Sequence, residues 1–540
     1  MSSALAFLAA CSGYGSSDGS TICLLCSEAS STNGHRFVAF ADLERIADLL
    51  AGGGRGRQSD ASVSCLRTLR EGFAFSEQRV RAALASDPTL SGAQELLFGE
   101  EGGRGGRGLA ICWKDCPLSQ AVYYALAGRG STAPSSSGAS IDAGYFQYFP
   151  DLYEEHLLQK VERVRGLLNG AWAGQWPALA SLETIASPRR HYRHRNRFGV
   201  SVNRGPGGPV ARWMIWDAAG WPSLEVDAAS FLVPSRAVCA LLAPLARGLA
   251  SDPLLLEGLQ AAHFLSTTAG HVSVQLIYSS PTQQQAAWLS AAGGLRQAAM
   301  RDAPEVCELS LARRSRRQKL LVGREEVRER LVLADGRALL YEQVADSFSN
   351  PNAAINTLVL DHLCSISRSI VASPGAHRLL ELFCGCGNHT VALAPLFEGT
   401  VGVEVSRALV AAARKNLLLN GCSEVASVLL GDAGKFTRGV RRREGFFGAG
   451  GGRFDCLLVD PPRAGLDALT RACVPLFDHV LYVSCDPASL ARDLASAALT
   501  ATHEVASVRC FDAFCYTPHI ETVVHLRRRG LGPGGEGSIG

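Results

Sequence analysis

The 540-residue chain has little lysine, no long apolar run and no large excess of either charge. Only five lysines accompany many arginines, which we attribute to a coding bias towards Arg, Ala and Gly. No run of 18 apolar residues exists, so we expect no membrane span. Because 53 basic residues face 50 acidic ones, the net charge of +3 does not indicate a nucleic-acid partner. Any basic surface must be local.

The N-terminus also lacks the basic residues of a targeting segment. No arginine precedes Arg36, which speaks against a secretory peptide and a mitochondrial presequence, while a Ser-rich organellar transit segment stays open. The 17 cysteines are odd in number and scattered, which favours reduced thiols inside the cell over a disulfide scaffold. We therefore expect a cytoplasmic protein, with the nucleus or an organelle as alternatives.

Residues 1–149 predict a Gly/Ser-rich extension of unknown role. Gly/Ser/Ala-rich tracts alternate with two segments of helical period, RFVAFADLERIADLL and SEQRVRAALA, and the linker STAPSSSGAS closes it. Two cysteine pairs, Cys23/Cys26 and Cys112/Cys116, have the number of ligands that a tetrahedral metal site needs. The pairs lie far apart and the first is in an apolar context, so we expect no metal.

Residues 150–349 predict an α+β module. LYEEHLLQKVERVRGLL has the period of an amphipathic helix. In HYRHRNRFGVSV, strand alternation places Arg193, Arg195 and Arg197 on one face and Phe198 on the other. Such a strand can hold a phosphate backbone and stack a base on an exposed aromatic ring. The alternative is a solvated edge strand with one core phenylalanine.

The rest of this module combines strands with local basic patches. HVSVQLIYSS reads as a strand, CELSLARRSRRQKLLV as a basic strand or loop, and GRALLYEQVADSFSNPN as a turn and strand entering a helix. The helix AAINTLVLDHLCSISRSIV then leads into a last domain, residues 350–529, followed by a flexible tail, 530–540.

The last domain begins with a strand, a glycine turn and a helix in HRLLELFCGCGNHTVALAPLF. Gly385 and Gly387 let the backbone approach a ligand. About 20 residues further on, Glu404 ends a second strand, where an acid can hydrogen-bond a ribose hydroxyl. The glycines of ELFCGCGN depart from GxGxxG and there is no GxxxxGK[ST] phosphate loop, which favours S-adenosylmethionine over NAD or a nucleoside triphosphate. A third unit puts Asp432 at a strand end, where it can face an adenine.

Two further strand ends carry chemically useful groups. FDCLLV is followed by Asp460 and two prolines, a rigid loop whose acid can contact cofactor or base, or simply start a helix. HVLYVS is followed by Cys485, and Glu521 comes about 36 residues later. A thiol and a carboxylate at one sheet edge suggest a nucleophile and a base. Cysteine is also a common small core residue, so the structural reading stays open.

The order ELFCGCGN, GVEV, FDCLLVDPPRAGLD, YVSCDP and FDAFCYTPHIE resembles the RNA m5U methyltransferases, specifically the tRNA (uracil-5-)-methyltransferases that modify uridine 54 of the T loop. The resemblance runs from about Leu152 to Arg527. It implies a Rossmann-like S-adenosylmethionine-dependent methyltransferase domain of α/β class, preceded by the RNA-binding module. The implied partner is tRNA, with no membrane and no metal, and we expect a monomer.

Carried over by position, the resemblance implies Cys485 as nucleophile and Glu521 as base. The implied cofactor-binding residues are Gln343, Phe383, Asn388, Glu404 and Asp460. On the RNA side we expect Phe198 to stack on a base, with contacts from Arg193, Arg195 and Arg463.

The chain departs from the family pattern at four positions. Asp486 stands where Asn is usual, Cys515 where Pro is usual, Phe383 where Tyr is frequent, and Pro518 where a second His is common. A carboxylate at Asp486 would raise the pKa of the neighbouring thiol unless it is turned away or hydrogen-bonded.

The implied chemistry assigns these groups distinct tasks. A thiolate adds to C6 of uracil, C5 then accepts the methyl group, and a carboxylate removes the C5 hydrogen so that the thiol leaves. We expect burial beside Phe511, Phe514 and Tyr516 to raise the pKa of Glu521. The alternatives are the same reaction on rRNA or on cytosine, and an RNA-binding or tRNA-folding factor whose methyl transfer is weak or lost.

Overall fold

The computed structural model divides the chain into two units, residues 1–140 with 219–222, and residues 141–218 with 223–540. In the first unit, β1 (Val38–Ala39) and β2 (Gly108–Leu109) form an antiparallel pair. Val38–Ala39 is thus strand inside a segment of predicted helical period. The described residues are 38–39, 108–109, 148, 150–171, 182–206, 208–216, 222–229, 231–345, 347–373, 377–442 and 453–531.

The expectations about a metal site and about a membrane span can be compared with the described residues only. The cysteine pairs Cys23/Cys26 and Cys112/Cys116 lie outside the described residues. Within the described ranges, no group of His, Cys, Asp and Glu side chains could hold a metal ion. No helix in the described part of the chain has the length and apolarity needed to cross a bilayer.

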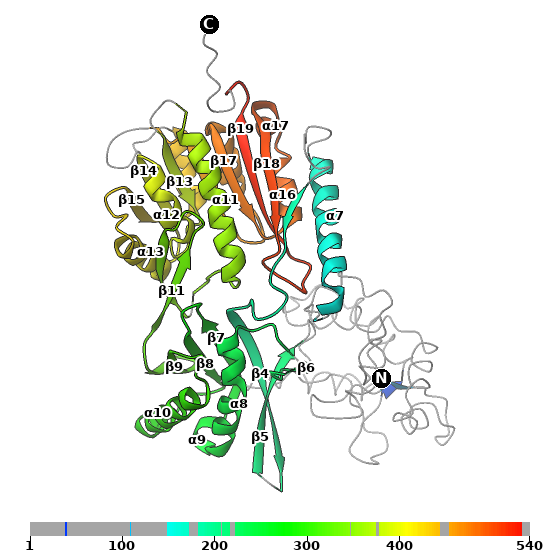
Figure 1. The fold of residues 1–540 in the computed structure, drawn as a ribbon, viewed down its shortest axis with the longest axis vertical. Helices are drawn as coiled ribbons and strands as arrows, with labels where there is room; N and C mark the ends of the chain where they lie inside the picture. Colours follow the sequence, from blue (N-terminus) through cyan, green and yellow to red (C-terminus); the bar gives the residue numbers. More distant parts are fainter. Residues whose placement is uncertain are drawn as a thin grey trace, which may run out of the picture. The chain divides into compact units, whose positions relative to one another are not determined.

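An eight-stranded sheet forms the C-terminal half, in the order β15-β14-β13-β16-β17-β19-β18-β3 (Figure 1). Strands β15 to β17 are parallel, and β19 runs antiparallel to both of its neighbours. The strands are β3 (Glu183–Ile185), β13 (Arg378–Leu382), β14 (Gly399–Glu404), β15 (Ala426–Leu430), β16 (Cys456–Val459), β17 (His479–Ser484), β18 (His503–Phe511) and β19 (Glu521–Arg528).

Both faces of this sheet are covered, which explains why its strands read as continuous apolar runs. In β16, Leu457 and Val459 pack in one core cluster, while Cys456 and Leu458 pack in the other. The helical segments of this half are α11 (Ala353–Val371), α12 (Asn388–Leu393), η5 (Ala394–Leu396), α13 (Arg407–Leu419), α14 (Ala433–Arg442), α15 (Ala468–Cys473), η6 (Val474–Leu476), α16 (Pro487–Leu494) and α17 (Ala497–Thr502).

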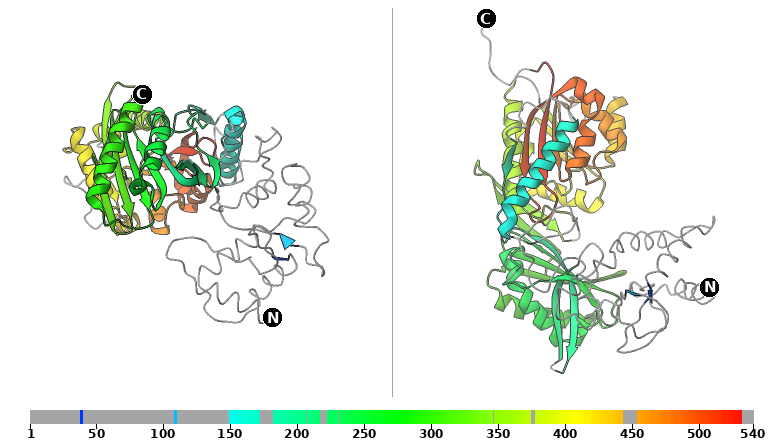
Figure 2. Two further views of the ribbon diagram at one scale, coloured as in Figure 1. Left: turned by 90° about the horizontal axis from the view of Figure 1, so that it is seen from below. Right: turned by 90° about the vertical axis from the view of Figure 1, so that its right-hand side faces the viewer.

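A seven-stranded sheet forms the preceding module, in the order β10-β9-β8-β7-β4-β5-β6 (Figures 1 and 2). Strands β10 with β9, β8 with β7, β7 with β4 and β4 with β5 pair antiparallel, whereas β8 and β9 are parallel and are connected through α10. The elements are β4 (Arg195–Gly205), β5 (Gly208–Trp216), β6 (Pro222–Glu225), α8 (Arg236–Ser251), α9 (Pro253–Leu256), β7 (Leu259–Ser266), β8 (His271–Tyr278), α10 (Gln285–Asp302), β9 (Glu308–Ser315) and β10 (Gln318–Val322).

A separate hairpin, β11 (Glu326–Val332) with β12 (Ala338–Val344), connects this module to α11. The basic segment CELSLARRSRRQKLLV is the β9–β10 hairpin, and the strands and helices predicted around residues 271–278, 353–371 and 479–494 are confirmed.

The first helical segments join the C-terminal sheet. η3 (Pro150–Leu152) leads into α7 (Tyr153–Ala171), which packs beside α16, and β3 adds a parallel strand at the edge next to β18 (Figures 1 and 2). β3 therefore belongs to the C-terminal sheet and α7 packs on its helix α16, whereas the sequence analysis placed both segments in the α+β module.

Candidate active site

Four strand ends meet at one edge of the eight-stranded sheet. Because β13, β14, β16 and β17 are parallel, the residues after their last positions share an edge. Those residues include the glycine turn after β13, Asp460 after β16 and Cys485 after β17. β19 runs the opposite way, so its first residue, Glu521, lies at this same edge.

The register of β17 and β19 brings the predicted nucleophile and base together. Ser484 pairs with Thr522. Cys485 directly follows Ser484 and Glu521 directly precedes Thr522, and the two are close enough for the charge of Glu521 to raise the pKa of the Cys485 thiol. Cys485 is partly exposed and Glu521 is only 6% exposed. The thiol and the carboxyl group are therefore neighbours.

Burial and mutual repulsion raise the pKa values of this group. Burial, then the charge of Asp460, raises the pKa of Glu521 to about 8, although His389 opposes the shift. Burial, followed by the charges of Glu521 and Asp460, raises the pKa of the Cys485 thiol to about 12. The pKa of Asp460 itself is raised to about 6, again mainly by burial. The raised pKa of Glu521 agrees with the sequence-based expectation.

A buried histidine next to these acids was not assigned a role from the sequence. His389 Nδ1 lies 3.5 Å from Glu381 Oε1, which has no hydrogen bond, while Glu381 Oε2 accepts one from Thr390 Oγ1 at 2.6 Å. Burial disfavours the charged imidazole, but Glu381, Asp460 and Glu521 outweigh this and raise the pKa of His389. His389 partly offsets the negative charge of the three carboxyl groups.

The glycine turn holds the acid of the neighbouring strand. Glu404 is 8% exposed, its Oε2 accepts from the Gly385 amide at 3.1 Å, and its Oε1 accepts from the Ser406 amide at 2.8 Å. Gly385 and Gly387 have positive φ, and a Cβ at Gly385 would meet no atom within 4 Å. The turn thus orients a carboxylate beside open space.

Phe383 begins this turn in a conformation unusual for its residue type. Its φ is 64°, in the left-handed region that a bulky side chain rarely adopts. Its side chain is partly buried against the core. Such strain persists where the surrounding structure enforces it, commonly at ligand sites.

The other two predicted cofactor residues lie close to the turn. Asn388 exchanges hydrogen bonds of 2.9 Å with the Asn356 side chain. Gln343 is on β12. Asn416 links β12 to the turn, because its side chain accepts a hydrogen bond from the Glu342 amide at 2.8 Å and donates one to the Cys386 carbonyl at 3.0 Å. Both residues come from segments that contact the glycine turn.

The unusual Asp486 has a local structural task. Its Oδ1 accepts a hydrogen bond of 2.9 Å from the Ser489 amide and so caps the N-terminus of α16. Among the groups that raise the pKa of Cys485, Asp486 comes after burial, Glu521 and Asp460. The Asp486 carboxylate is therefore hydrogen-bonded, which is one of the two conditions that the sequence analysis gave for a carboxylate beside the Cys485 thiol.

On the RNA side, the expected exposure of Phe198 is wrong. The β4 alternation is as predicted, but the Phe198 side chain is 3% exposed and packs against Phe264 at a centroid distance of 5.6 Å. It belongs to the module core, because the inward face of β4 is covered. A base cannot stack on this ring without rearrangement of that core.

The three predicted arginines differ in their surroundings. Arg193 Nε donates to the Arg195 carbonyl at 2.9 Å, and Arg195 donates to Ser349 Oγ and to the Ala345 carbonyl, both at 3.2 Å. Both side chains are half-buried, and Arg195 helps to hold the chain before it enters α11. Arg463 is exposed beside the thiol, whose pKa it lowers.

Comparisons with known proteins agree with this geometry. Residues 152–529 match the family model described as tRNA (uracil-5-)-methyltransferase. A tRNA/tmRNA (uracil-C(5))-methyltransferase from Aeromonas hydrophila is 36% identical over 70% of this chain and 95% of its own length. The enzyme of the same name from Aromatoleum aromaticum is 36% identical over 63% and 87% of the two chains.

A solved structure shares the fold. The Pyrococcus abyssi tRNA (uracil-54, C5)-methyltransferase, in complex with S-adenosyl-L-homocysteine, superimposes with a TM-score of 0.51 at 17% identity, over 73% of this chain and 87% of that one. This confirms the Rossmann-like methyltransferase class of the C-terminal sheet. With the family model and relatives at 36% identity, the protein belongs to the tRNA (uracil-5-)-methyltransferase family.

Proposed function

We propose that this protein transfers a methyl group from S-adenosyl-L-methionine to C5 of a uridine in tRNA, through a covalent adduct of Cys485 with C6. The observation that carries the proposal is that Cys485 and Glu521 adjoin the paired residues Ser484 and Thr522, at the ends of β17 and β19. Family membership supports the substrate class. Uridine 54 of the T loop is the target we propose within tRNA.

The residues at the glycine turn fit S-adenosyl-L-methionine. Glu404 is oriented by two backbone amides and keeps acceptor capacity for ribose hydroxyls. Val405, which is 67% exposed, offers an apolar surface for a purine beside it. The open space at Gly385 admits a ligand close to the backbone. Gln343, Phe383, Asn388 and Asp460 are the further cofactor-binding residues that we propose.

When bound, the cofactor supplies an electrophilic methyl group. Cys485 adds as a thiolate to C6 of the uracil, which places the electron pair at C5 and lets C5 take the methyl group. Glu521 then removes the hydrogen that remains on C5. The electrons of that C–H bond re-form the C5–C6 double bond, and the Cys485 sulfur leaves.

Protonation states must change during this cycle. With a pKa near 12, the Cys485 thiol holds its proton at neutral pH in the free protein, mainly because of burial and secondly because of Glu521. The proton must reach a nearby acceptor when the uracil binds, and Asp460, whose pKa near 6 leaves it mostly ionised at neutral pH, is the acceptor that we propose. A Glu521 pKa near 8 suits proton removal close to neutral pH.

The RNA contacts follow from charge and exposure. A base must leave its stack to reach a thiol at the sheet edge, at a cost of a few kcal/mol. Arg463, exposed beside the thiol, is placed to contact the flipped nucleotide. Arg193, Arg195 and the basic β9–β10 hairpin are proposed to contact phosphates, which makes binding salt-sensitive.

The wider assignments are also proposals. Residues 150–349 serve RNA binding and residues 350–529 catalysis, although α7 and β3 belong to the catalytic sheet. The extension 1–149 has no assigned role, and 530–540 is a tail. The protein acts as a monomer in the cytoplasm, without a metal or a membrane.

A labelling experiment tests the proposal. Unmodified tRNA transcript is incubated with purified protein and methyl-labelled cofactor, and the labelled nucleoside is identified. Label on uridine C5 supports the proposal, and Glu521→Gln should then accumulate a protein–RNA adduct that survives denaturing electrophoresis. Label on cytosine, label only on rRNA fragments, or tRNA binding without label each rule it out in favour of the corresponding alternative.

A further inference from the structure

The loop that precedes Glu521 is not part of any strand. β18 ends at Phe511 and β19 begins at Glu521, so residues 512–520 form a loop between them. Tyr516 within it has a φ of 60°. Backbone hydrogen bonds from Asp512 to Ile185 and from Thr517 to Phe514 hold part of this loop, and side chains add further anchors. The loop begins directly after Phe511, the residue of β18 that pairs with Glu521, so its first residues adjoin the base.

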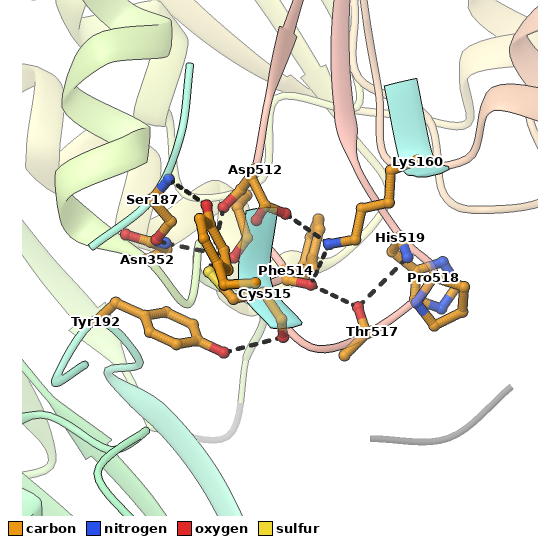
Figure 3. Close-up of polar contacts among 12 residues, drawn as sticks. Lys160, Ser187, Tyr192, Asn352, Asp512, Phe514, Cys515, Thr517, Pro518 and His519 are labelled. Carbon is orange, nitrogen blue, oxygen red and sulfur yellow. Dashed lines mark hydrogen bonds and ion pairs between the residues drawn. The ribbon is translucent and has the colours of Figure 1, made fainter. Parts of the chain in front are cut away.

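One anchor comes from α7, at the other end of the sequence. Lys160 Nζ donates to Asp512 Oδ1 at 2.6 Å and to the Phe514 carbonyl at 2.9 Å, as Figure 3 shows. Both charged side chains of this ion pair are 1% exposed. One turn further along α7, Arg163 Nη1 lies 3.5 Å from the Pro518 carbonyl. The same helix therefore contacts the loop near its start, its middle and its end.

The loop is also held from the chain entering the RNA module. Tyr192 Oη donates to the Cys515 carbonyl at 3.1 Å (Figure 3), and Tyr516 Oη donates to the Arg189 carbonyl at 2.8 Å. These two tyrosines act on the later part of the loop. Lys160 differs from them because it is a charged group and reaches the first residues after β18.

Because the Lys160 side chain is buried, its ammonium group depends on the partners that it has in this loop conformation. An ammonium group removed from water is costly unless it is paired and hydrogen-bonded, and the two contacts that Lys160 makes go to residues 512–514. A displaced loop would break both contacts at once. The buried pair thus favours one loop conformation over others.

We propose that Lys160 is a positioning residue for the last step of the reaction, the removal of the C5 proton by Glu521. The inference rests on the proposed function. The nucleophile is held differently, because Cys485 follows β17 and precedes the Asp486-capped α16, and none of the hydrogen bonds of Lys160 reaches that segment. Loss of Lys160 therefore slows elimination more than adduct formation.

The test uses Lys160→Met in the full chain, with Gln159→Met as the matched control. Gln159 is the adjacent residue, and its side chain donates a hydrogen bond of 3.3 Å to Glu155 Oε1 of the same helix. In Lys160→Met we expect turnover to fall by about 10–100-fold, as for a catalytic group displaced by about 1 Å. The covalent protein–RNA adduct should accumulate, the cofactor Kd should change less than about twofold, and the control should behave as wild type.

A double variant separates positioning from stability. Lys160→Met leaves Asp512 buried without its cation, whereas Lys160→Met with Asp512→Leu removes both charges and should restore the thermal stability. We expect the double variant to fold normally and still accumulate adduct. Wild-type turnover in the double variant, or in a folded Lys160→Met, overturns the inference.

The two proposals fail in different ways. If the wild type labels no tRNA uridine, or if Glu521→Gln traps no adduct, the proposed function fails and Lys160 has no elimination step to assist. In the other case, the wild type methylates tRNA and Glu521→Gln traps the adduct. If the Lys160 variants then accumulate no adduct, only the role of Lys160 is refuted.

Discussion

The two large sheets of this protein differ in where they keep their charges. At the active edge of the eight-stranded sheet, the carboxyl groups of Glu381, Glu404 and Glu521 are at most 8% exposed. On the seven-stranded sheet, arginines such as Arg197 and Arg316 are exposed. Burial shifts the pKa of an acid into the range useful for proton transfer, whereas phosphate binding needs charge that solvent and RNA can reach.

The largest expected effect comes from removing the nucleophile at the buried edge. Cys485→Ala should lower methyl transfer to tRNA by at least about 10³-fold, because no adduct can form and C5 stays unreactive. The control is Cys307→Ser, which removes an exposed free thiol just before β9 of the seven-stranded sheet. Equal activity of the two variants in the labelling assay would contradict the assignment of Cys485.

The pH dependence of elimination tests the burial of the base. Glu521 must be ionised to accept a proton, so with a pKa near 8 the elimination rate should rise about tenfold per pH unit below that value. Single-turnover decay of the adduct measures this rate. A profile already flat at pH 6 would show that Glu521 is not held at a raised pKa.

The same pKa predicts an effect on stability with a definite sign. Because the folded protein binds the proton more tightly than the unfolded chain, the stabilising effect of protonated Glu521 is full below pH 4.5 and is lost as pH rises to about 8. Thermal unfolding of Glu521→Gln should therefore depend less on pH across this window than that of the wild type. An identical dependence would refute the shift.

On the exposed sheet, charge removal should change RNA affinity by a smaller factor. Arg316 and Arg317 form the exposed turn of the basic β9–β10 hairpin. Replacing both with serine should reduce the slope of log K against log[salt] by about 1.5 if each contacts one phosphate. The control is Arg247→Ser. Because the exposed Arg247 is already paired with Asp302, its replacement should leave the slope unchanged. Filter binding at several salt concentrations decides between these outcomes.

The smallest effect distinguishes core packing from base stacking on β4. Phe198→Leu should lower the unfolding free energy by about 1 kcal/mol and leave tRNA affinity unchanged below the melting range, because the ring is buried against Phe264. A stacking ring would lose affinity without losing stability. Denaturant unfolding and tRNA titration of one preparation measure both quantities.

Much of the fold and site could be predicted because the signals are local. The strand His479–Ser484, the capped helix after it and the glycine turn each follow from residue types within a few positions. The motif order also identified the family, and so the cofactor. The raised pKa of Glu521 was expected from the aromatic residues around it.

The errors and omissions involve contacts between distant residues. Alternation along β4 placed Phe198 correctly on one face, but only the packing of the module decided that this face is buried. His389 could have been suspected from its place directly after the glycine turn, yet its partner Glu381 lies on the preceding strand. Lys160 and Asp512 are 352 positions apart, and neither has a local signal.

By itself, the sequence determined the order of strands, turns and helices, and which groups end each strand, because these depend on local periodicity and turn chemistry. Only the tertiary structure decided that β19 runs antiparallel beside β17, which brings Glu521 and Cys485 to the same sheet edge, and that α7 buries a lysine against the loop before that base. The physical reason is that both arrangements depend on pairing and desolvation between segments far apart in the chain.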